Sequence, residues 1–331
     1  MFASAQSAAV YSYDVPWFMY AIVVAALVIY AIIEAINMRT DHVIGFKEAV
    51  RWSVVYVSAA LLFAIPIYVF IGTQATGEYL GAWAIEKALS LDNLFVISLI
   101  FASFRVPAKF QRRMLNYGIA GAIFFRLLFI LAGVELLKRF EWIGIIFGLI
   151  LVRAAWNAYK EARRGHDESE EDIKNSKLWK GITRIFPVHP EFDGHKFTTI
   201  VNGKRMLTMM GAIVILIECT DIVFAVDSVP AVLAISPDRF IAYSSNVFAL
   251  LGLRALFFVY QSVSSKFWAL NWALAAILAW IGFKMIAAPL GLHIPIGISL
   301  TILFLLLSAG LFVSLKWPHD SDNVTTDTAG K

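Results

Sequence analysis

Nine apolar segments divide this sequence of 331 residues, and each is about as long as a helix that crosses a lipid bilayer. The connections between them are short, apart from one polar stretch at 160–205. The pattern predicts an all-α polytopic membrane protein of about nine transmembrane helices, forming a single membrane domain over 1–331. The predicted spans are 17–36, 52–71, 80–104, 116–137, 141–159, 206–234, 240–261, 267–288 and 293–315.

Composition excludes a soluble fold, because 60% of the residues are hydrophobic and only 16% are charged, against roughly 45–50% and about 25% in soluble domains. The single cysteine, Cys219, excludes an intramolecular disulfide and a cysteine-cluster metal site. The net charge of +4 gives no sign of nucleic-acid binding. The six histidines lie in loops or at a span edge, and no nucleophile–base pair stands out, so neither an organic cofactor nor enzyme activity is expected.

Basic residues are distributed unevenly between the two sets of loops. The side that holds the N-terminus contains three, namely Lys138, Arg139 and Arg239. The opposite side contains 20, of which seven precede the 160–205 loop, ten lie within it and three follow it. Cytoplasmic loops carry the excess of lysine and arginine, so we expect an external N-terminus, a cytoplasmic C-terminus and a cytoplasmic 160–205 loop.

Ten ionisable residues lie well inside the predicted spans. A charge at the centre of a bilayer costs about 2.5–3.5 kcal/mol on the insertion scale, so such residues are functional candidates by default. Glu34 and Glu135 lie near span ends, where an interfacial position is expected. The acids are Glu86, Asp92, Glu218, Asp221 and Asp227, and the bases are Lys87, Arg126, Arg153, Arg254 and Lys284.

These charges form an internal repeat. Aligning Asp92 in the third span with Asp221 in the sixth places an arginine 34 and 33 residues later, at Arg126 and Arg254. One span further on come Arg153 and Lys284. Three spans separate the copies, which predicts a 3+3 inverted repeat of 80–159 and 206–288, with the other three spans as additions. Inverted repeats place a substrate site near the midplane, on interrupted helices, and Pro230 makes a local break plausible next to Asp227.

The central acids exceed Lys87, Arg126 and Arg254 by two formal charges, which a divalent cation would neutralise. Carboxylate, amide and hydroxyl oxygens suit Mg²⁺, Ca²⁺ or Mn²⁺, and Ser90, Thr220, Ser228 and Asn246 are further oxygen donors. The alternative is a purely structural role, in which these residues form interhelical salt bridges such as Asp92–Arg126 and Asp221–Arg254. The expected metal ligands are Glu86, Asp92, Asn93, Glu218, Asp221 and Asp227, with Arg126, Arg254 and Lys87 as charge partners.

The remaining charged residues have simpler expected roles. Arg153 and Lys284 are expected to reach toward the interface or to form pairs near span ends. The loop sequence HPEFDGH (189–195) contains enough donors to hold a metal loosely, but a solvated loop is the better interpretation.

Three stretches resemble the TerC family, and most closely its Alx-type members: EKALSLDN (86–93), ECTDIVFAVDSVPA (218–231) and SNVFALLGLRALFF (245–258). The resemblance covers nearly the whole chain. It implies a multispanning protein of the bacterial inner membrane that exports Mn²⁺ from the cytoplasm and is linked to tellurite resistance. The choice of Mn²⁺ and the direction of transport rest on this resemblance alone. The alternative is a non-transporting membrane partner in tellurite or metal stress, or in metallation of exported proteins, with 160–205 as the docking surface for a cytoplasmic protein.

Overall fold

The computed structural model describes residues 12–37, 45–140, 142–164, 170–194, 196–201, 203–263, 268–292 and 294–316. Asp92 lies within a described helix, but its side chain is outside the described set, as is His195. The first half contains α1 (Trp17–Asn37), α2 (Phe46–Phe70), α3 (Thr73–Ser103), α4 (Ala108–Arg139), α5 (Ile143–Arg164), α6 (Glu170–Asn175) and α7 (Lys177–Ile185). The second half contains β1 (Thr198–Val201), β2 (Lys204–Leu207), α8 (Met209–Ile235), α9 (Arg239–Leu251), α10 (Leu253–Val263), α11 (Trp268–Ala287) and α12 (Ile296–Lys316).

Among the described residues, six helices are long and apolar enough to cross a membrane, or seven if the bent pair α9–α10 is counted as one span. The prediction of nine spans is therefore confirmed only in part. Helix α3 has 31 residues but does not qualify, because Glu78, Glu86, Lys87 and Asp92 are distributed along it. Helix α11 has 20 residues, of which the described apolar stretch is Trp272–Ala287.

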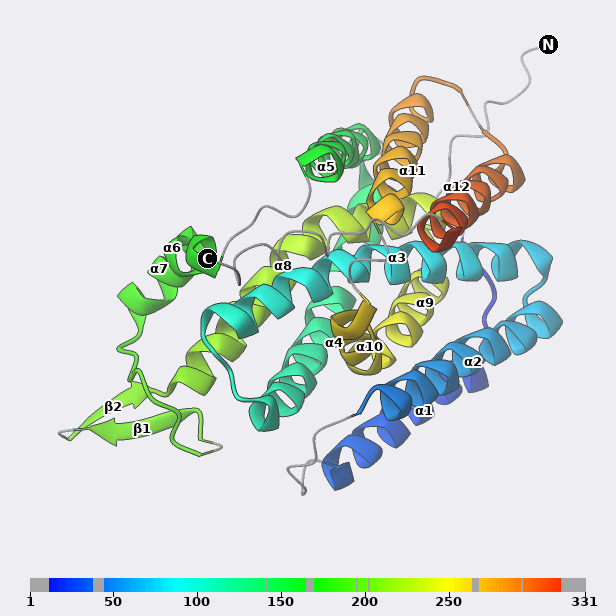
Figure 1. The fold of residues 1–331 in the computed structure, drawn as a ribbon. Coiled ribbons are helices and arrows are strands. Elements are labelled where there is room, and N and C mark those ends of the chain that lie inside the picture. The colour runs from blue at the N-terminus through cyan, green and yellow to red at the C-terminus, as the bar shows by residue number, and fades with distance from the viewer. Residues whose placement is uncertain are drawn as a thin grey trace, which may run out of the picture.

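The helices of the two predicted repeats pack across each other. Helix α4 packs on α8, α3 packs on α9, and α5 lies along α11 (Figure 1). Helices α1 and α2 lie at one side of this group, and α12 covers α11 and part of α3. This exchange of partners is the arrangement that an inverted repeat would require, although the repeat itself remains a prediction.

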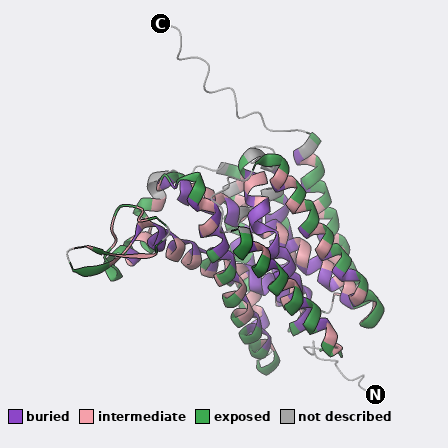
Figure 2. Cartoon of the chain, turned by 90° about the horizontal axis from the view of Figure 1, so that it is seen from below, coloured by how far each residue is buried: buried purple, intermediate pink, exposed green. Residues whose placement is uncertain are grey.

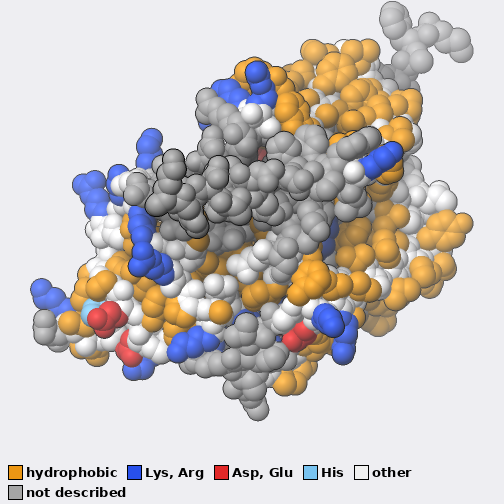
Figure 3. Space-filling model, viewed as in Figure 1, with side chains coloured by type: hydrophobic (Ala, Val, Ile, Leu, Met, Phe, Trp, Pro, Cys, Tyr) orange, Lys and Arg blue, Asp and Glu red, His pale blue; other side chains and the backbone are white. Residues whose placement is uncertain are grey.

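Burial follows the expectation for a membrane protein. The buried residues lie along the contacts between helices, and the exposed ones lie on the outside of the bundle (Figure 2). Much of the exposed surface of α1 and α2 is apolar, including Trp17, Ile36, Leu62 and Val69. In Figure 3 hydrophobic side chains cover the side of α1, α2 and α12, whereas lysine and arginine gather around α7 and the strands.

Helices α6 and α7 and strands β1 and β2 form a small folded module within 170–207. Strands β1 and β2 pair in antiparallel register, with Thr198 opposite Leu207. Trp179 contacts Phe104, at 4.4 Å between ring centroids, and Phe192 stacks on Phe110 at 5.3 Å. These aromatic contacts hold the module against the ends of α3 and α4, and hydropathy alone does not reveal them.

The interrupted helix lies at a different place from the one predicted. Helix α8 continues through Pro230, so the expected break at Asp227–Pro230 is wrong. The chain instead bends by 45° between α9 and α10, at Gly252. Lys87 donates a hydrogen bond of 2.6 Å to the carbonyl oxygen of Ala249 at this bend. A proline removes one backbone hydrogen bond, and α8 nevertheless continues from Met209 to Ile235.

Candidate ion-translocation site

Arg126 of α4 lies at the centre of the charged residues. Its side chain is completely buried and contacts a carboxylate from each predicted repeat. It donates to Glu86 of α3, and it donates from Nη2 and Nε to Asp221 of α8 over 3.2 Å and 3.4 Å. A single guanidinium therefore joins the two halves of the molecule through charge-assisted hydrogen bonds.

Glu218 lies one turn before Asp221 on α8 and reaches toward α4. Its carboxylate fills the space that a Cβ atom would take at Gly121, so only glycine leaves room for it. Glu218 Oε2 and Glu86 Oε2 are buried and have no hydrogen-bond partner among the described residues. If all ionise, the three acids around Arg126 leave a net formal charge of −2, because three negative charges face one positive charge.

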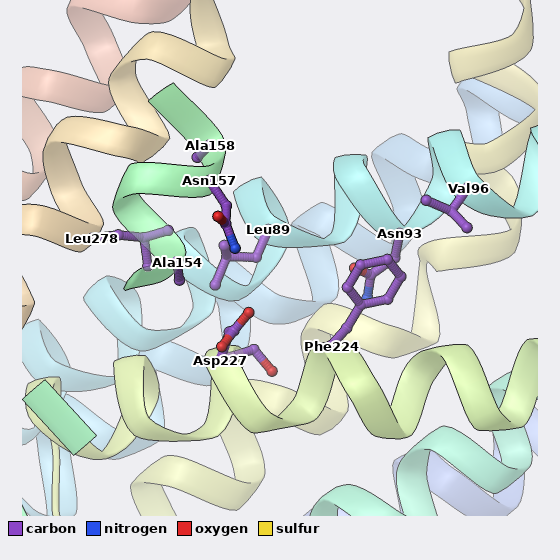
Figure 4. A pocket seen from close by; sticks show the side chains of 10 residues that line it. Leu89, Asn93, Val96, Ala154, Asn157, Ala158, Phe224, Asp227 and Leu278 are labelled. Atoms are coloured by element: carbon purple, nitrogen blue, oxygen red, sulfur yellow. The ribbon is translucent and has the colours of Figure 1, made fainter. Parts of the chain in front are cut away.

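A cavity of about 220 Å³ lies between α3, α5, α8 and α11. Its polar lining consists of Asn93 of α3, Asn157 of α5, and Asp227 and Ser228 of α8. Figure 4 shows the side chains of Asn157 and Asp227 pointing toward one another across the cavity. Asn93 and Asp227 are predicted ligands, whereas sequence reasoning missed Asn157, which carries no charge and lies outside the acidic motifs of the third and sixth spans.

Helices α3 and α8 run in opposite directions past this cavity. Leu89 lies on the side of Asp227, and Asn93 lies on the side of Phe224 (Figure 4). Glu86 and Asn93 are seven residues apart on α3, so they share one face and are about 10 Å apart along the helix axis. One face of α3 therefore serves both the Arg126 cluster and the cavity.

The hydroxyl and amide side chains differ in whether they already make a hydrogen bond. Ser90 and Thr220 donate to the carbonyl oxygens of Glu86 and Leu216 in their own helices. Ser228 Oγ and Asn246 Nδ2 are buried and lack a hydrogen-bond partner among the described residues. Ser228, which lines the cavity, is the better placed of these two to reach an ion.

Arg254 does not pair with Asp221, so the alternative of an Asp221–Arg254 salt bridge is wrong. It contacts Glu34 of α1, and Asn116 of α4 donates to the same oxygen over 2.8 Å. Glu34 is only 4% exposed, so neighbouring helices cover its side chain. The sequence did not predict this contact, because a position near the end of an apolar run does not show which side of the helix is covered.

Of the two other bases, Arg153 differs from expectation, whereas Lys284 lies in the last turn of its helix as expected. Arg153 lies at the middle of α5 rather than near its end and is exposed on the outer surface. Lys284 donates to the carbonyl oxygen of Ala234 over 3.3 Å. Both residues lie beside the second repeat's helices α8 and α11 rather than at the centre of the Arg126 cluster.

A buried acid near the start of α3, Glu78, escaped the sequence analysis. Its carboxylate accepts hydrogen bonds from Tyr13 at 2.7 Å, Gln74 at 3.0 Å and Ser236 at 2.6 Å. It lies just outside the predicted third span, so the count of charges within spans did not include it. Its oxygens are used by hydrogen bonds that tie the start of α3 to Tyr13 and Ser236.

The described side chains form no group of three or more acids, histidines or cysteines with the geometry of a metal site. Arg126 lies between Glu86 and Asp221, and Asp227 faces the separate cavity. In the polar module, His189 lies 3.7 Å from Glu191, and Asp193 pairs with Lys196 at 3.4 Å. Asp92 is a further predicted ligand, and its side chain lies outside the described residues.

Comparison with known proteins decides the family. The profile of the integral membrane protein TerC family matches residues 71–322. The chain belongs to this family. The match includes α3 through α11, and so all the residues of the Arg126 cluster and of the cavity.

Relatives of this TerC family protein extend over most of the chain. An uncharacterized membrane protein of Rickettsia bellii (strain RML369-C) is 38% identical over 299 residues, which is 90% of this chain and 96% of the relative. A membrane protein of Myxococcus xanthus is 37% identical, covering 84% and 85%. Alx of Escherichia coli O157:H7, named as a candidate membrane-bound redox modulator, is 36% identical, covering 90% and 95%. No solved structure matches.

Proposed function

We propose that this protein is a secondary transporter that exports a hard divalent cation, Mn²⁺ above all, from the bacterial cytoplasm. The observation that carries the proposal is the contact of one buried arginine with acids from α3 and α8. A polar cavity lies along the same two helices. Membership of the TerC family supports this function, and the choice of Mn²⁺ and of efflux follows the family resemblance.

The donors around the two sites favour a hard cation. Glu86, Asp221 and Glu218 offer carboxylate oxygens, and Asp227, Ser228, Asn93 and Asn157 line the cavity with oxygen donors. Oxygen ligands suit Mg²⁺, Ca²⁺ and Mn²⁺, whereas Cu(I) prefers thiolate and thioether ligands. An acid-lined path repels an oxyanion such as tellurite, so any effect on tellurite resistance is indirect.

Competition for carboxylates supplies a mechanism. Without a bound cation, Arg126 pairs with Glu86 and Asp221 and offsets part of their charge. A divalent ion entering from the cavity attracts the same oxygens, and protons compete with it, because a carboxylate must lose its proton to bind a metal. We infer that binding draws the acids away from Arg126, and that protonation from the outside releases the ion. Helices α3 and α8 would then move relative to one another as the repeats exchange access.

The proposed orientation places the 170–207 module in the cytoplasm. Its exposed side carries Lys177, Lys180, Arg184, Lys204 and Arg205, and the excess of basic residues on this side of the sequence supports that topology. The N-terminus would then lie outside the inner membrane, and export would run from the module's side of the bilayer to the opposite side.

Metal flux in proteoliposomes tests the proposal. Purified protein is reconstituted, and uptake of Mn²⁺, Mg²⁺, Ca²⁺ and Zn²⁺ is followed with and without a pH gradient. We expect Mn²⁺ flux that Asp221→Asn and Asp227→Asn each reduce by at least about tenfold, as lost metal ligands would. The matched control is Glu135→Gln, which removes an exposed carboxylate that pairs with Arg239 at 2.7 Å.

One result would contradict the transport function, and another would contradict the assigned site. The first is the absence of flux of any of the four metals, with and without a pH gradient. The unfolding temperature of the same preparation must show that the protein is folded. The second is flux through Asp221→Asn and Asp227→Asn at the native rate, which would leave transport intact but remove the assigned site. Cellular manganese content in cells expressing the same variants, including Asp92→Ala, provides an independent check.

A non-transporting role rests on a different observation. Within the described module, Ile185 and Ile200 are 71% and 74% exposed, next to a surface rich in basic residues. Such a surface suits a cytoplasmic protein partner that assists in metal stress or in metallation of exported proteins. Ile200→Lys would then abolish metal tolerance in cells while leaving flux in proteoliposomes unchanged. Deletion of 166–195 should likewise abolish metal tolerance in cells and leave flux in proteoliposomes unchanged.

A further inference from the structure

A deep apolar groove lies between α5 and α11 on the outer surface of the bundle. Its volume is about 760 Å³, and it is separate from the cavity at Asp227. The two helices meet closely at Gly148 and Gly282, where an added Cβ on Gly148 would lie 2.8 Å from the Gly282 carbonyl oxygen. The groove runs along the helices beside this contact, with Leu149 and Val152 exposed on its α5 wall. A slot of this kind, open to the bilayer, suits a hydrocarbon chain.

One cation lies in this apolar wall. Arg153 lines the groove and is the eleventh residue of the apolar stretch Ile143–Lys160. The described residues give it no ion pair or hydrogen bond, although the cost of a charge at this depth is high. No described acid pairs directly with Arg153, although Asp227 lies within its electrostatic range. The groove wall therefore leaves the guanidinium available to an anion that comes to it within the bilayer.

Aromatic rings and further cations mark the end of the groove beyond Arg153. Trp156 stacks on Tyr159 at 5.6 Å between centroids, and the Tyr159 ring meets Trp272 of α11 edge-on at 5.5 Å. Lys160 lies 5.4 Å above the Trp156 ring. Tryptophan and tyrosine gather at the level of lipid headgroups, so this cluster marks the membrane surface.

We propose that the groove binds an anionic phospholipid, with one acyl chain along α5 and α11 and the phosphate at Arg153. The apolar walls match the acyl chain, and the phosphate supplies the charge that Arg153 lacks. Arginine is well suited to the role, because its planar guanidinium donates two parallel hydrogen bonds to phosphate oxygens. Lys160 attracts the headgroup from the aqueous side, which favours an anionic lipid over a zwitterionic one.

The site borders the cavity without sharing its polar lining. Arg153 is within electrostatic range of Asp227, and its neighbours Ala154 and Asn157 line the cavity from the same helix. A bound phosphate would therefore change the electrostatic potential at the cavity. Lipid binding itself does not depend on what the cavity holds, so it can be tested whether or not the protein transports metal.

Native mass spectrometry of the purified full chain in detergent tests the lipid site. Delipidated protein is titrated with phosphatidylglycerol and, separately, with phosphatidylcholine of the same acyl chains. We expect phosphatidylglycerol to bind at least about tenfold more tightly, the equivalent of one charge-assisted hydrogen-bond pair. Arg153→Gln should abolish that preference. Arg139→Gln, which alters an exposed arginine at the end of α4, is the matched control and should retain it.

A second variant tests the groove without changing any charge. Ala279→Trp fills the α11 wall and should weaken the binding of both lipids, while Arg153 remains in place. The proposal is overturned if the native protein binds the two lipids equally, or if Arg153→Gln retains the preference. It is also overturned if the groove holds a second copy of the chain. That result would appear as a two-chain species that Ala279→Trp dissociates and added phosphatidylglycerol does not.

Discussion

Arg126 and Arg254 occupy corresponding places in the predicted repeat, yet their surroundings differ. Arg126 contacts acids of α3 and α8, one from each repeat. Arg254 contacts Glu34 of α1, a helix outside both repeats. The first arginine therefore lies where the two halves meet, and the second ties an additional helix to one of them.

The difference suggests a division of roles. Glu86, which contacts Arg126, and Glu218, one turn before Asp221, each retain a buried oxygen with no described hydrogen-bond partner. The polar cavity lies along the same helices. Around Arg254, Asn116 adds a hydrogen bond to the carboxylate oxygen that the arginine contacts. We interpret the Arg126 cluster as the part that exchanges partners during transport, and the Arg254 cluster as a fixed attachment of α1.

The largest effect is expected from Arg126→Met. It leaves Glu86 and Asp221 buried without their cation, and breaking a buried pair costs about 3–5 kcal/mol. We expect the free energy of unfolding in detergent to fall by this amount, and metal flux to be lost. Arg139→Met, at an exposed position, is the control. A variant that unfolds like the native protein would show that the two acids are already neutral or solvated.

A smaller effect is expected from Arg254→Met, about 3 kcal/mol, because only Glu34 loses its cation. The double variant Glu34→Met/Arg254→Met should recover most of this loss, since apolar residues can replace a buried pair at little cost. We expect the double variant to retain metal flux in proteoliposomes. Loss of flux in a stable double variant would mean that the Arg254 cluster takes part in transport, which contradicts the proposed division.

The smallest effect is expected from Gly121→Ala, about 1–2 kcal/mol, as typical of overpacking. The added methyl group displaces the carboxylate of Glu218, which is flexible and can shift. Gly181→Ala on α7 is the matched control, because nothing lies within 4 Å of its added Cβ. That change should leave the stability unchanged or raise it by up to about 1 kcal/mol. Comparable losses in both variants would contradict the placement of Glu218 beside α4.

Particular residues show how far the sequence could predict the site. Glu86, Asp221 and Arg126 were all expected to be buried charges, and the structure brings them together. The partner of Arg254 was not predictable, because Glu34 lies more than 200 positions away and only the packing of α1 brings it close. Asn157 was missed because it carries no charge, and Glu78 because it precedes the apolar run.

The fold also has parts that the sequence predicted and parts that it did not. Apolar runs predicted where the helices lie, because the bilayer requires continuous hydrophobic segments. They did not predict that α8 would pass through Pro230 unbroken, or that the bend would fall at Gly252. At the bend, Lys87 donates to the carbonyl oxygen of Ala249, a contact from another helix that the apolar pattern does not contain. The 170–207 module was missed because its aromatic contacts join segments far apart in the chain.

The sequence by itself determined which charges this protein retains inside its apolar segments, because the cost of burial makes such residues rare and therefore visible. Only the tertiary structure decided their partners. Pairing depends on the rotation and crossing of helices, and packing sets both. Arg126 lies between two acids because α4 packs on α8 and the arginine side chain also reaches α3. Arg153 faces outward because α5 turns that side away from the bundle.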